Sequence, residues 1–298
     1  MSDEYDDIRW GLAQRFEFIE WRVYWVGRVN RKDLEDQFHI STPQASSDFK
    51  RYLDTVPENI AYDASQKSYV ATSGFRPRFL KLSPERYLLQ LQAIRSDAIR
   101  KADTWFDHLP SSDAIPMIVR GPEAFTLRAL IRAIEFGGSI EINYRSLSRV
   151  DVRTVCPHAF AHDGFRWHVR ALSIERQDYR DYVLGRILSV SEPKSSDARA
   201  NDDIEWQTEV SLKLIPHPNL NDDQKLAIEH DYRLKDGHLI LKMRAALVFY
   251  FIRRHNLDLR KGEIPPERAQ LYLENYEEVG ERVDEAKRQT KEILTNKL

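Results

Sequence analysis

One stretch of the sequence, GFRWHVRA at residues 164–171, alternates apolar and polar side chains. A strand has a period of two, so one face carries Phe165, Trp167, Val169 and Ala171. The other face carries Arg166, His168 and Arg170. Guanidinium groups are planar forks that hold a phosphate through two hydrogen bonds, so this face predicts an anion receptor. A solvated outer face of an ordinary strand explains the same alternation.

Arginine dominates the sequence around this stretch. Residues 122–193 contain ten arginines and no lysine, although lysine occurs elsewhere in the chain. Arg145 and Arg186 stand where neighbouring predicted strands end, which favours several strands converging on one site. An arginine-biased genome accounts for part of this pattern.

Composition limits the classes of function. A length of 298 residues predicts about two domains, and a net charge of -2 excludes a globally basic nucleic-acid coat. Any nucleic-acid surface must therefore be a local patch. The acidic residues 1–7 and the absence of a long apolar run predict a cytoplasmic protein with no membrane partner. Cys156 is the single cysteine, which excludes an internal disulfide and a cysteine-rich zinc site; no metal or cofactor is expected.

A helix-turn-helix is predicted over residues 31–53. Residues 31–38 form a short helix, residues 39–41 a turn, and residues 42–53 a second helix capped by Ser41 or Thr42. A hairpin at residues 60–71 supplies the wing. An ordinary pair of antiparallel helices is the alternative interpretation.

The outward face of the second helix predicts contacts with DNA. Small hydrogen-bonding side chains lie near the start of this helix and cations toward its end, which suits base edges and phosphates in a major groove. The candidate DNA-binding residues are Ser41, Thr42, Gln44, Ser46, Ser47, Lys50, Arg51 and, at the tip of the wing, Lys67.

The winged helix is expected to be connected to the rest of the chain by a linker and a helix. Residues 74–82 predict a linker, and Ser83 caps a helix that runs to about His108. The prolines of residues 109–122 end that helix. A long helix between two domains can carry a conformational change from one domain to the other, or it can serve only as a spacer.

The middle of the chain resembles the WYL domain. One helix and several short antiparallel strands predict a small barrel. The resemblance rests on the following motifs: Ile140-x-Ile142-x-Tyr144, Pro157-His158, Gly164-x-x-Trp167-His168-Val169 and Tyr182-x-Leu184-x-Arg186-Ile187. The triplet that gives the family its name reads Trp167-His168-Val169 here, and Val183 replaces a usual arginine. These departures indicate a subfamily with an altered pocket.

The whole chain is most similar to WYL-domain transcriptional regulators of the BrxR/CapW type, repressors that accompany phage-defence islands. The resemblance implies an α+β multidomain protein. Its parts are a winged helix-turn-helix (1–80), a linker helix (81–121), an Sm-like or SH3-like β-barrel (122–195), and a WCX-like α/β dimerisation extension with a terminal helix (204–298). It further implies a homodimer that binds an inverted repeat in double-stranded DNA, represses a BREX or CBASS operon, and is released by an anionic nucleotide or oligonucleotide.

The resemblance also implies a ligand pocket. By motif position the pocket residues are Tyr144, His158, Trp167, His168, Arg170 and Arg186; Ser146 and Arg166 are added from the side on which they face. Tyr144 and His158 are also suited to the core, where Trp167 is expected. If Arg170 is an open receptor, Arg170→Ala leaves operator binding intact and removes the response to inducer.

The C-terminal third predicts a linker at residues 191–203 and then two strand-helix pairs. The strands are expected at 204–215 and 238–243, the helices at 221–230 and 245–255, and a charged amphipathic helix at 265–298. The resemblance implies that this part pairs two protomers, and its apolar second helix needs a cover from its own sheet or from a partner chain.

An enzyme is not expected. The sequence has no P-loop, no HExxH motif and no spaced carboxylate cluster beside a basic motif, and Cys156 and His158 are too close along a strand to meet in catalytic geometry. Two alternatives to a repressor remain. One is an RNA-binding or single-strand-binding protein built on the Sm-like barrel, and the other is a transcriptional activator of the DNA-damage type.

Overall fold

The computed structural model describes residues 10–116, 118, 120–196, 200–258 and 263–296. It divides into two compact units between residues 118 and 119, and each unit is described by itself. The acidic residues 1–9 and part of the predicted linker, residues 197–199, lie outside the described residues. Within the described part, no helix is long and apolar enough to span a bilayer.

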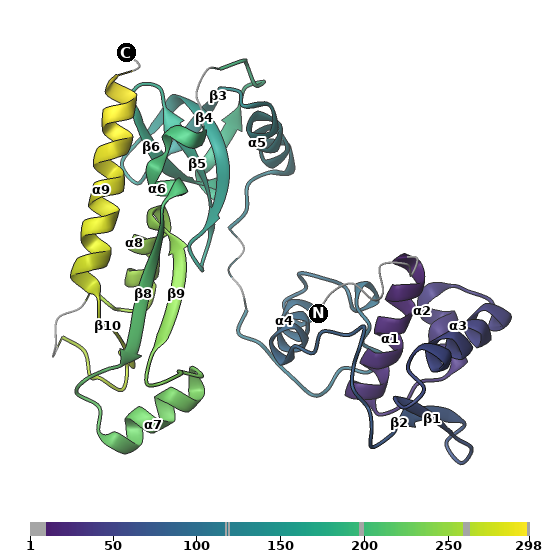
Figure 1. The fold of residues 1–298 in the computed structure, drawn as a ribbon. Helices are drawn as coiled ribbons and strands as arrows, with labels where there is room; N and C mark the ends of the chain where they lie inside the picture. Colours follow the sequence, from purple (N-terminus) through teal and green to yellow (C-terminus); the bar gives the residue numbers. More distant parts are fainter. Residues whose placement is uncertain (1–9, 117, 119, 197–199, 259–262, 297–298) are drawn as a thin grey trace. The chain divides into compact units, whose positions relative to one another are not determined.

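The first unit is a helical domain with a two-stranded hairpin (Figure 1). α2 ends at His39, whose φ of 52° is left-handed, and the side chain of Ser41 caps α3 by accepting a hydrogen bond from the Gln44 N–H. The predicted helix-turn-helix and wing are thereby confirmed. The elements are α1 (Trp10–Val26), α2 (Arg31–Phe38), α3 (Thr42–Thr55), β1 (Ile60–Asp63), β2 (Ser68–Ala71), α4 (Pro84–Arg95) and η1 (Lys101–Asp103).

The core of this unit follows from helical spacing. On α3, Ala45, Phe49 and Tyr52 lie at positions i, i+4 and i+7 and are all buried, as the sequence predicts. They pack on Leu34 of α2 and Ile19 of α1. Burying each large side chain stabilises the fold by roughly 1.5–3 kcal/mol. These contacts hold α3 in the core while its polar face is directed to solvent.

A buried carboxylate fixes the segment that follows the wing. Glu20 of α1 is fully buried and accepts hydrogen bonds from the Tyr52 hydroxyl at 3.0 Å and from the backbone N–H groups of Arg78, Phe79 and Leu80 at 2.7–3.0 Å. Burial raises the pKa of Glu20 above its ordinary value, although these hydrogen bonds act in the opposite direction. The segment predicted as a loose linker at 74–82 is therefore anchored to α1 and α3.

α4 is much shorter than predicted. Ser83 caps it as expected, but the helix ends at Arg95 instead of continuing to about His108. Asp97 has a φ of 55°, which turns the chain back. The following aromatic pair, 105–106, then packs against Trp21 of α1. A straight helix would carry these aromatic side chains into water, so the prediction of one continuous helix from Ser83 to about His108 is wrong.

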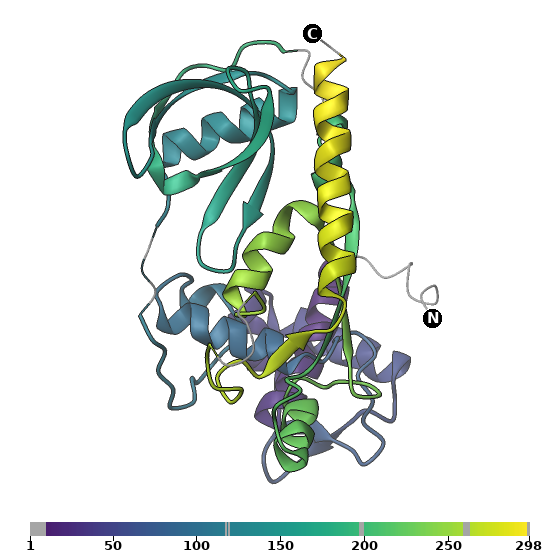
Figure 2. The ribbon, with the colours of Figure 1, turned by 90° about the vertical axis from the view of Figure 1, so that its left-hand side faces the viewer.

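The first half of the second unit is a five-stranded antiparallel sheet with one helix. Its elements are α5 (Ala124–Phe136), β3 (Ile140–Arg145), β4 (Val150–His162), β5 (Trp167–Ser173), β6 (Asp178–Val183), η2 (Leu184–Arg186) and β7 (Ile187–Val190). The strands pair in the order β6-β5-β4-β3-β7, and the sheet curves around α5 (Figure 2). Among the described strands β6 and β7 are unpaired edges, so the expected closure into an Sm-like barrel is not confirmed.

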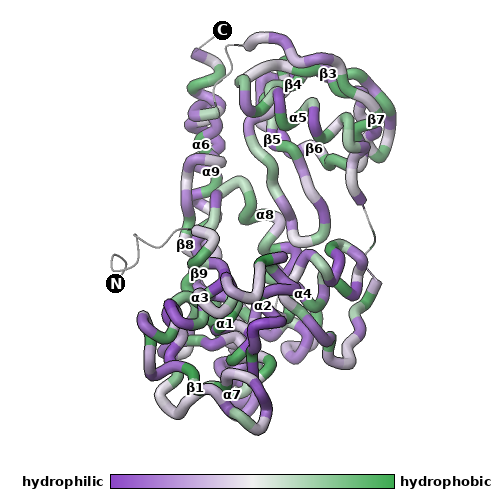
Figure 3. Tube along the Cα trace, turned by 90° about the vertical axis from the view of Figure 1, so that its right-hand side faces the viewer, coloured by the Kyte–Doolittle hydropathy of each residue, from purple (hydrophilic) through white to green (hydrophobic). Residues whose placement is uncertain are grey.

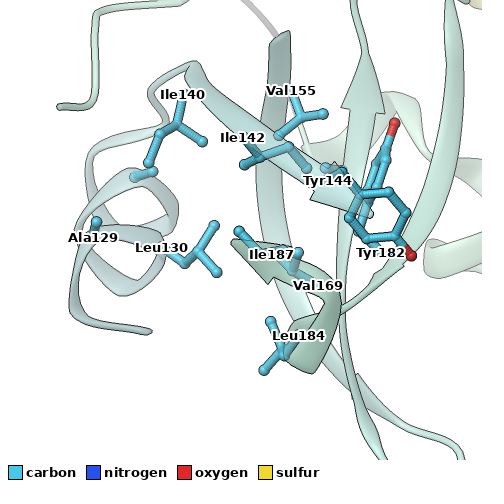
Figure 4. Packing of buried hydrophobic residues seen from close by; sticks show 12 residues of the cluster. Ala129, Leu130, Ile140, Ile142, Tyr144, Val155, Val169, Tyr182, Leu184 and Ile187 are labelled. Carbon is cyan, nitrogen blue, oxygen red and sulfur yellow. The ribbon is translucent and has the colours of Figure 1, made fainter. Parts of the chain in front are cut away.

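Apolar side chains from α5 and the strands meet inside this curve (Figure 4). Leu130 of α5, Ile140 and Ile142 of β3, and Val155 of β4 are almost completely buried. Alternate residues of β3 face inward, as predicted from its Ile-x-Ile-x-Tyr pattern. The core therefore fixes which face of each strand remains for other contacts.

The second half of this unit packs against that sheet. Its elements are η3 (Ala200–Asp202), α6 (Ile204–Gln207), β8 (Glu209–Pro216), α7 (Asp222–Asp231), β9 (Leu239–Arg244), α8 (Ala245–Arg254), β10 (Leu271–Leu273) and α9 (Tyr276–Thr295). The strands pair in the order β10-β8-β9. α9 runs alongside β8 (Figure 1), and its hydrophilic and hydrophobic residues alternate along the helix (Figure 3).

Two predicted boundaries in this half are wrong. The strand expected from residue 204 begins at Glu209, because Asp203 accepts a hydrogen bond from the Trp206 N–H and starts the short helix α6. The helix expected from residue 265 begins at Tyr276. Leu271 and Leu273 instead alternate along β10 and face the core with a period of two.

Candidate nucleic-acid interface and ligand cleft

The outward face of α3 carries most of the residues predicted to bind DNA. The exposed ones are Ser41, Thr42, Gln44, Lys50, Arg51 and, at the hairpin tip, Lys67; Ser46 and Ser47 are partly buried. Lys67 has a φ of 50°, which places it in the turn between β1 and β2. The structure thus presents polar and cationic side chains on one helix face with the wing beside it.

Gln44 is held in place by its neighbours. Its Nε2 donates to Asp48 Oδ1 at 2.8 Å, and Arg15 Nε donates to Asp48 Oδ2 at 2.6 Å. Asp48 is fully buried, so this arrangement satisfies a charge that would otherwise be costly. The amide of Gln44 therefore keeps a fixed orientation, with its oxygen free to accept.

A groove of about 390 Å³ lies between the start of α2, the start of α3 and the wing. It brings Arg31 and Lys32 of α2 together with Tyr62 and Lys67 of the hairpin. Sequence reasoning missed Arg31, Lys32 and Tyr62. The signal was available, because two consecutive cations directly follow the cap Asn30 at the start of a helix-turn-helix. Phosphate is the group that such a set of cations binds.

The second candidate site is a cleft of about 700 Å³ in the second unit. β6 and the turn that precedes it form one side, and α8 and α9 contribute to the other. The described lining contains six Lys or Arg side chains against three carboxylates, an excess that favours an anionic ligand. Five tyrosine and phenylalanine side chains complete the lining.

The seven ligand-binding candidates that remain when Trp167 is assigned to the core are not gathered in this cleft. Of the seven, Tyr144 and Arg170 line it, and His158 lines a smaller cavity of about 90 Å³ nearby. Ser146 instead closes the turn between β3 and β4, where its hydroxyl bonds to the backbone of Arg149. Arg186 lies in η2 and not at a strand end.

The polar face predicted for β5 is buried instead of open. His168 and Arg170 are 2% and 4% exposed, whereas Phe165 and Trp167 of the predicted apolar face are 71% and 51% exposed. Val169 and Ala171 do lie in the core. Neither the open anion receptor nor the solvated face is therefore correct, because a second layer of protein covers the polar side of this strand.

Arg170 is surrounded by three carboxylates. It binds Asp203 through two hydrogen bonds, from Nε at 2.6 Å and from Nη2 at 2.9 Å. Nη2 also donates to Glu205 Oε2 at 3.2 Å, and Nη1 to Asp181 Oδ1 at 3.4 Å. His158 Nε2 lies 2.9 Å from Asp203 Oδ2, the same oxygen that accepts from Arg170 Nε. Two strands of the sheet thus hold the start of the C-terminal half, including the end of the predicted linker.

Two of the three carboxylates around Arg170 have pKa values shifted in opposite directions. Burial acts to raise the pKa of Asp203, but hydrogen bonds from His158 and Arg170 outweigh burial and keep this pKa below its ordinary value. Burial raises the pKa of Glu205 above its ordinary value, even though the positive charge of Arg170 opposes that shift. Asp203 is therefore the tightly held partner of Arg170, and Glu205 is the one more easily neutralised.

Arg166 and His168 share a different acid. Arg166 Nε and His168 Nε2 lie 3.2 Å and 2.9 Å from Asp163 Oδ2, at the turn between β4 and β5. The pKa of Asp163 falls to about 2, because the hydrogen bonds from His168 and the backbone outweigh burial, which acts to raise it. Both residues therefore stabilise the hairpin and lie apart from the lining of the cleft.

The cleft contains cations that sequence reasoning did not single out. They are Arg153 on β4, Arg176 and Arg180 around the turn into β6, and Lys287 and Lys291 on α9. The guanidinium of Arg153 lies 4.9 Å from the ring centre of Tyr144 and 5.7 Å from that of Tyr182. The three arginines belong to the lysine-free segment; of the arginines that the sequence singled out, Arg170 alone is in the described lining of the cleft.

Comparison with known proteins assigns the parts of the chain. Residues 11–93 match the BrxR transcriptional regulator winged helix-turn-helix domain, residues 126–192 the WYL domain, and residues 209–279 the BrxR transcriptional regulator C-terminal dimerization domain. A DNA-binding transcriptional repressor CapW from Escherichia coli (strain KTE188) is 36% identical over 273 residues, which cover 91% of each chain. The chain belongs to the BrxR/CapW family.

Other BrxR/CapW relatives agree. Repressors named CapW from Stenotrophomonas maltophilia and Pseudomonas aeruginosa are 35% and 36% identical, and each comparison covers 91% of this chain. Among solved structures, the proteasome accessory factor PafBC of Arthrobacter aurescens is 16% identical with a TM-score of 0.29; the match covers 91% of this chain and 45% of that one. The predicted membership of the BrxR/CapW family is confirmed. Most of α9, from residue 280 on, lies beyond the three matched domains.

Proposed function

We propose that this protein is a ligand-responsive transcriptional repressor that binds an inverted repeat in double-stranded DNA as a homodimer. The observation that carries the proposal is the exposed face of α3 beside a groove with Arg31 and Lys32 of α2 and Lys67 of the wing, in a chain similar over 91% of its length to repressors named as DNA-binding. Two such faces related by a twofold axis read two half-sites. The protein regulates transcription in the cytoplasm and is not an enzyme.

The proposed dimer rests on the C-terminal half. Residues 209–279 match a domain that is named for dimerisation in BrxR. The dimer supplies the symmetry that an inverted repeat requires.

The proposed signal is an anionic nucleotide or oligonucleotide that binds in the cleft of the second unit. The excess of cations and the aromatic lining support this class of ligand. Release from DNA requires that the ligand bind the DNA-free arrangement of the dimer more tightly than the DNA-bound one. We propose a phage-defence operon, BREX or CBASS, as the target, as the resemblance to regulators of the BrxR/CapW type implies.

Gel-shift titration separates this function from the alternatives. The full chain is titrated against duplex DNA from its own promoter, a random duplex of equal length, and single-stranded RNA of the promoter sequence. We expect the promoter duplex to bind most tightly and a reporter behind that promoter to rise when the gene is deleted. Preference for the RNA would replace this proposal with the single-strand alternative, and a fall of the reporter would indicate an activator.

Replacing Lys50 by glutamine should weaken binding to all duplexes alike. Lys50 is exposed on α3, and a phosphate contact contributes about one unit to the slope of log affinity against log salt. We expect that slope to flatten by about one per protomer, as measured by fluorescence anisotropy at several salt concentrations. Lys101→Gln, an exposed lysine on η1, is the matched control and should leave the slope unchanged.

Replacing Gln44 by alanine should instead change sequence preference. The orientation of the Gln44 amide is fixed by Asp48, and one good base contact contributes about 1–3 kcal/mol of discrimination. We expect binding to the promoter duplex to fall by that amount while binding to the random duplex hardly changes. Equal losses on the two duplexes would show that Gln44 does not read a base.

A further inference from the structure

Arg22 of α1 is a buried cation that lies between two acidic side chains. It is 5% exposed, and its Nη2 donates to Asp33 Oδ1 at 2.9 Å while its Nη1 donates to Asp107 Oδ2 at 3.3 Å. Its Nε is buried without a hydrogen-bond partner among the described residues. The guanidinium thus connects the first turn of α2 to the segment that follows η1.

The acid on α2 fixes the start of that helix. Asp33 Oδ2 accepts a hydrogen bond from the Asn30 N–H at 2.7 Å, and Asn30 Oδ1 accepts one from the Asp33 N–H at 3.1 Å. This capping box holds the first helical turn in one conformation. Arg31 and Lys32, which line the groove beside the wing, belong to the same turn. The contact between Arg22 and Asp33 therefore sets the position of these two cations relative to α1.

The segment at residues 105–107 also contacts α1 through its aromatic side chains. The ring centre of Trp105 lies 5.7 Å from that of Phe18, which in turn lies 5.3 Å from that of Phe38 at the end of α2. Both pairs are edge-to-face, an arrangement that favours defined ring positions. Residues 105–107 thus act on α2 through α1 at both of its ends, through Arg22 at the start and Phe18 at the end.

The two ion pairs of Arg22 differ in strength. The Asp33 side chain is 19% exposed and the Asp107 side chain 53%, so water screens the pair with Asp107 more strongly. The contact with Asp107 can therefore open while α1 and α2 stay packed. Residue 107 stands in the sequence between the DNA-binding residues and the second unit, which begins at residue 119. This position suits a contact that adjusts the groove.

We propose that Arg22 positions Arg31 and Lys32 for contact with DNA phosphates, and that Asp107 makes these contacts depend on the docking of residues 105–107. The inference rests on the proposed function, because it requires the groove beside the wing to bind the DNA backbone. Arg22 is buried and is a positioning residue; it does not touch DNA itself. Undocking of residues 105–107 leaves the guanidinium with one acid, loosens the first turn of α2 and lowers the affinity for DNA.

Replacing Asp107 by alanine in the full chain separates positioning from simple charge. Removal of an acid makes the protein more positive, and electrostatics alone would then strengthen binding to DNA. We expect weaker binding instead, by about threefold or more on the promoter duplex and the random duplex alike, as measured by fluorescence anisotropy. Asp103→Ala is the matched control: Asp103 is exposed in the same part of the chain and pairs with Arg100. This control should bind DNA as tightly as the parent or slightly more tightly.

A double-mutant cycle tests whether Arg22 acts through the groove. Arg22→Met is expected to weaken binding by about tenfold and to flatten the slope of log affinity against log salt by up to about two per protomer, since two phosphate contacts are displaced. In a chain that carries Arg31→Gln and Lys32→Gln, the same change should weaken binding by less than about twofold. Arg22→Lys keeps the charge and should restore part of the affinity. Urea denaturation of each variant checks that the winged-helix unit is folded.

Two outcomes would overturn the inference. The first is binding by Asp107→Ala that equals or exceeds that of the parent. The second is an equal loss from Arg22→Met with and without the cations of the groove, which a purely structural role produces. If Arg22→Met does not fold, the comparison of Asp107→Ala with Asp103→Ala decides. Failure of the unsubstituted chain to bind the promoter duplex would contradict the proposed function, whereas promoter binding that is insensitive to Asp107 contradicts this inference alone.

Discussion

Replacing Arg170 by methionine is expected to destabilise the second unit by about 3–5 kcal/mol. Methionine fills similar space but leaves Asp181, Asp203 and Glu205 without the cation that compensates them. Arg170 is 4% exposed, so water cannot take over its role. The variant should therefore lose the contact between β5 and the start of the C-terminal half, in contrast to the selective loss of inducer response that an open receptor predicts.

Urea denaturation with hydrogen-exchange mass spectrometry measures this effect in the full chain. We expect peptides from β5, β6 and α6 to lose protection at a lower urea concentration, while peptides from α1 and α3 do not change. Arg176→Met is the matched control because Arg176 is exposed; it should change stability by less than about 0.5 kcal/mol. Equal stability of the Arg170 and Arg176 variants would show that the three acids do not need the guanidinium.

Replacing Glu20 by alanine is expected to destabilise the winged-helix unit by a similar amount, about 3–5 kcal/mol. Its carboxylate is the shared acceptor for the Tyr52 hydroxyl and for three consecutive backbone N–H groups at residues 78–80. Each buried donor left without an acceptor costs about 1–3 kcal/mol, although these costs are not additive. Because the Tyr52 hydroxyl loses its acceptor, α3 should also be held less firmly in the core.

Hydrogen exchange in α1 and α3 and promoter binding report this effect together. Glu17→Ala is the matched control on the same helix, because Glu17 contacts Gln14 and Arg86 only at 3.4 Å; we expect it to cost less than about 1 kcal/mol. Glu20→Gln keeps one acceptor oxygen, so its stability should lie between those of Glu20→Ala and Glu17→Ala. If Glu20→Ala were as stable as Glu17→Ala, residues 78–80 would be held by other contacts.

The sequence predicted those elements whose signals are local. Three such signals act within a few residues, and the structure confirms them. They are the cap at Ser41, the apolar spacing of Ala45, Phe49 and Tyr52, and the alternation of β3. The WYL motifs likewise depend on short spacings and identified the family. Local signals suffice in these cases because the side chains involved contact their own element or the next one.

The failures involve partners that are distant in sequence. Asp203 is 33 residues from Arg170, and no pattern around either residue indicates that they meet. The alternation of β5 correctly separates two faces but cannot show that a later segment covers the polar one. The end of α4 depends on the aromatic pair 105–106 returning to Trp21, a tertiary contact that overrides helix propensity.

The cations of the cleft were missed for a related reason. Lys287 and Lys291 belong to a charged helix whose sequence is typical of a solvated surface, and only packing on β8 and α6 brings them to the sheet. Arg176 and Arg180 flank the start of a strand and are two of ten arginines in their segment. Composition alone therefore pointed to a segment that contributes four arginines to the described lining of the cleft, of which only Arg170 was a named candidate.

The guanidinium of Arg170 is already hydrogen-bonded to carboxylates, which limits the affinity of any anion that enters the cleft. An incoming anion gains binding free energy from this guanidinium only if its own interaction is stronger than that of the carboxylate it displaces. Small ions that are abundant in every cell, such as chloride or free phosphate, make too few simultaneous contacts to meet that condition. If the proposed signal binds in this cleft, the paired guanidinium of Arg170 therefore makes the response insensitive to such small anions.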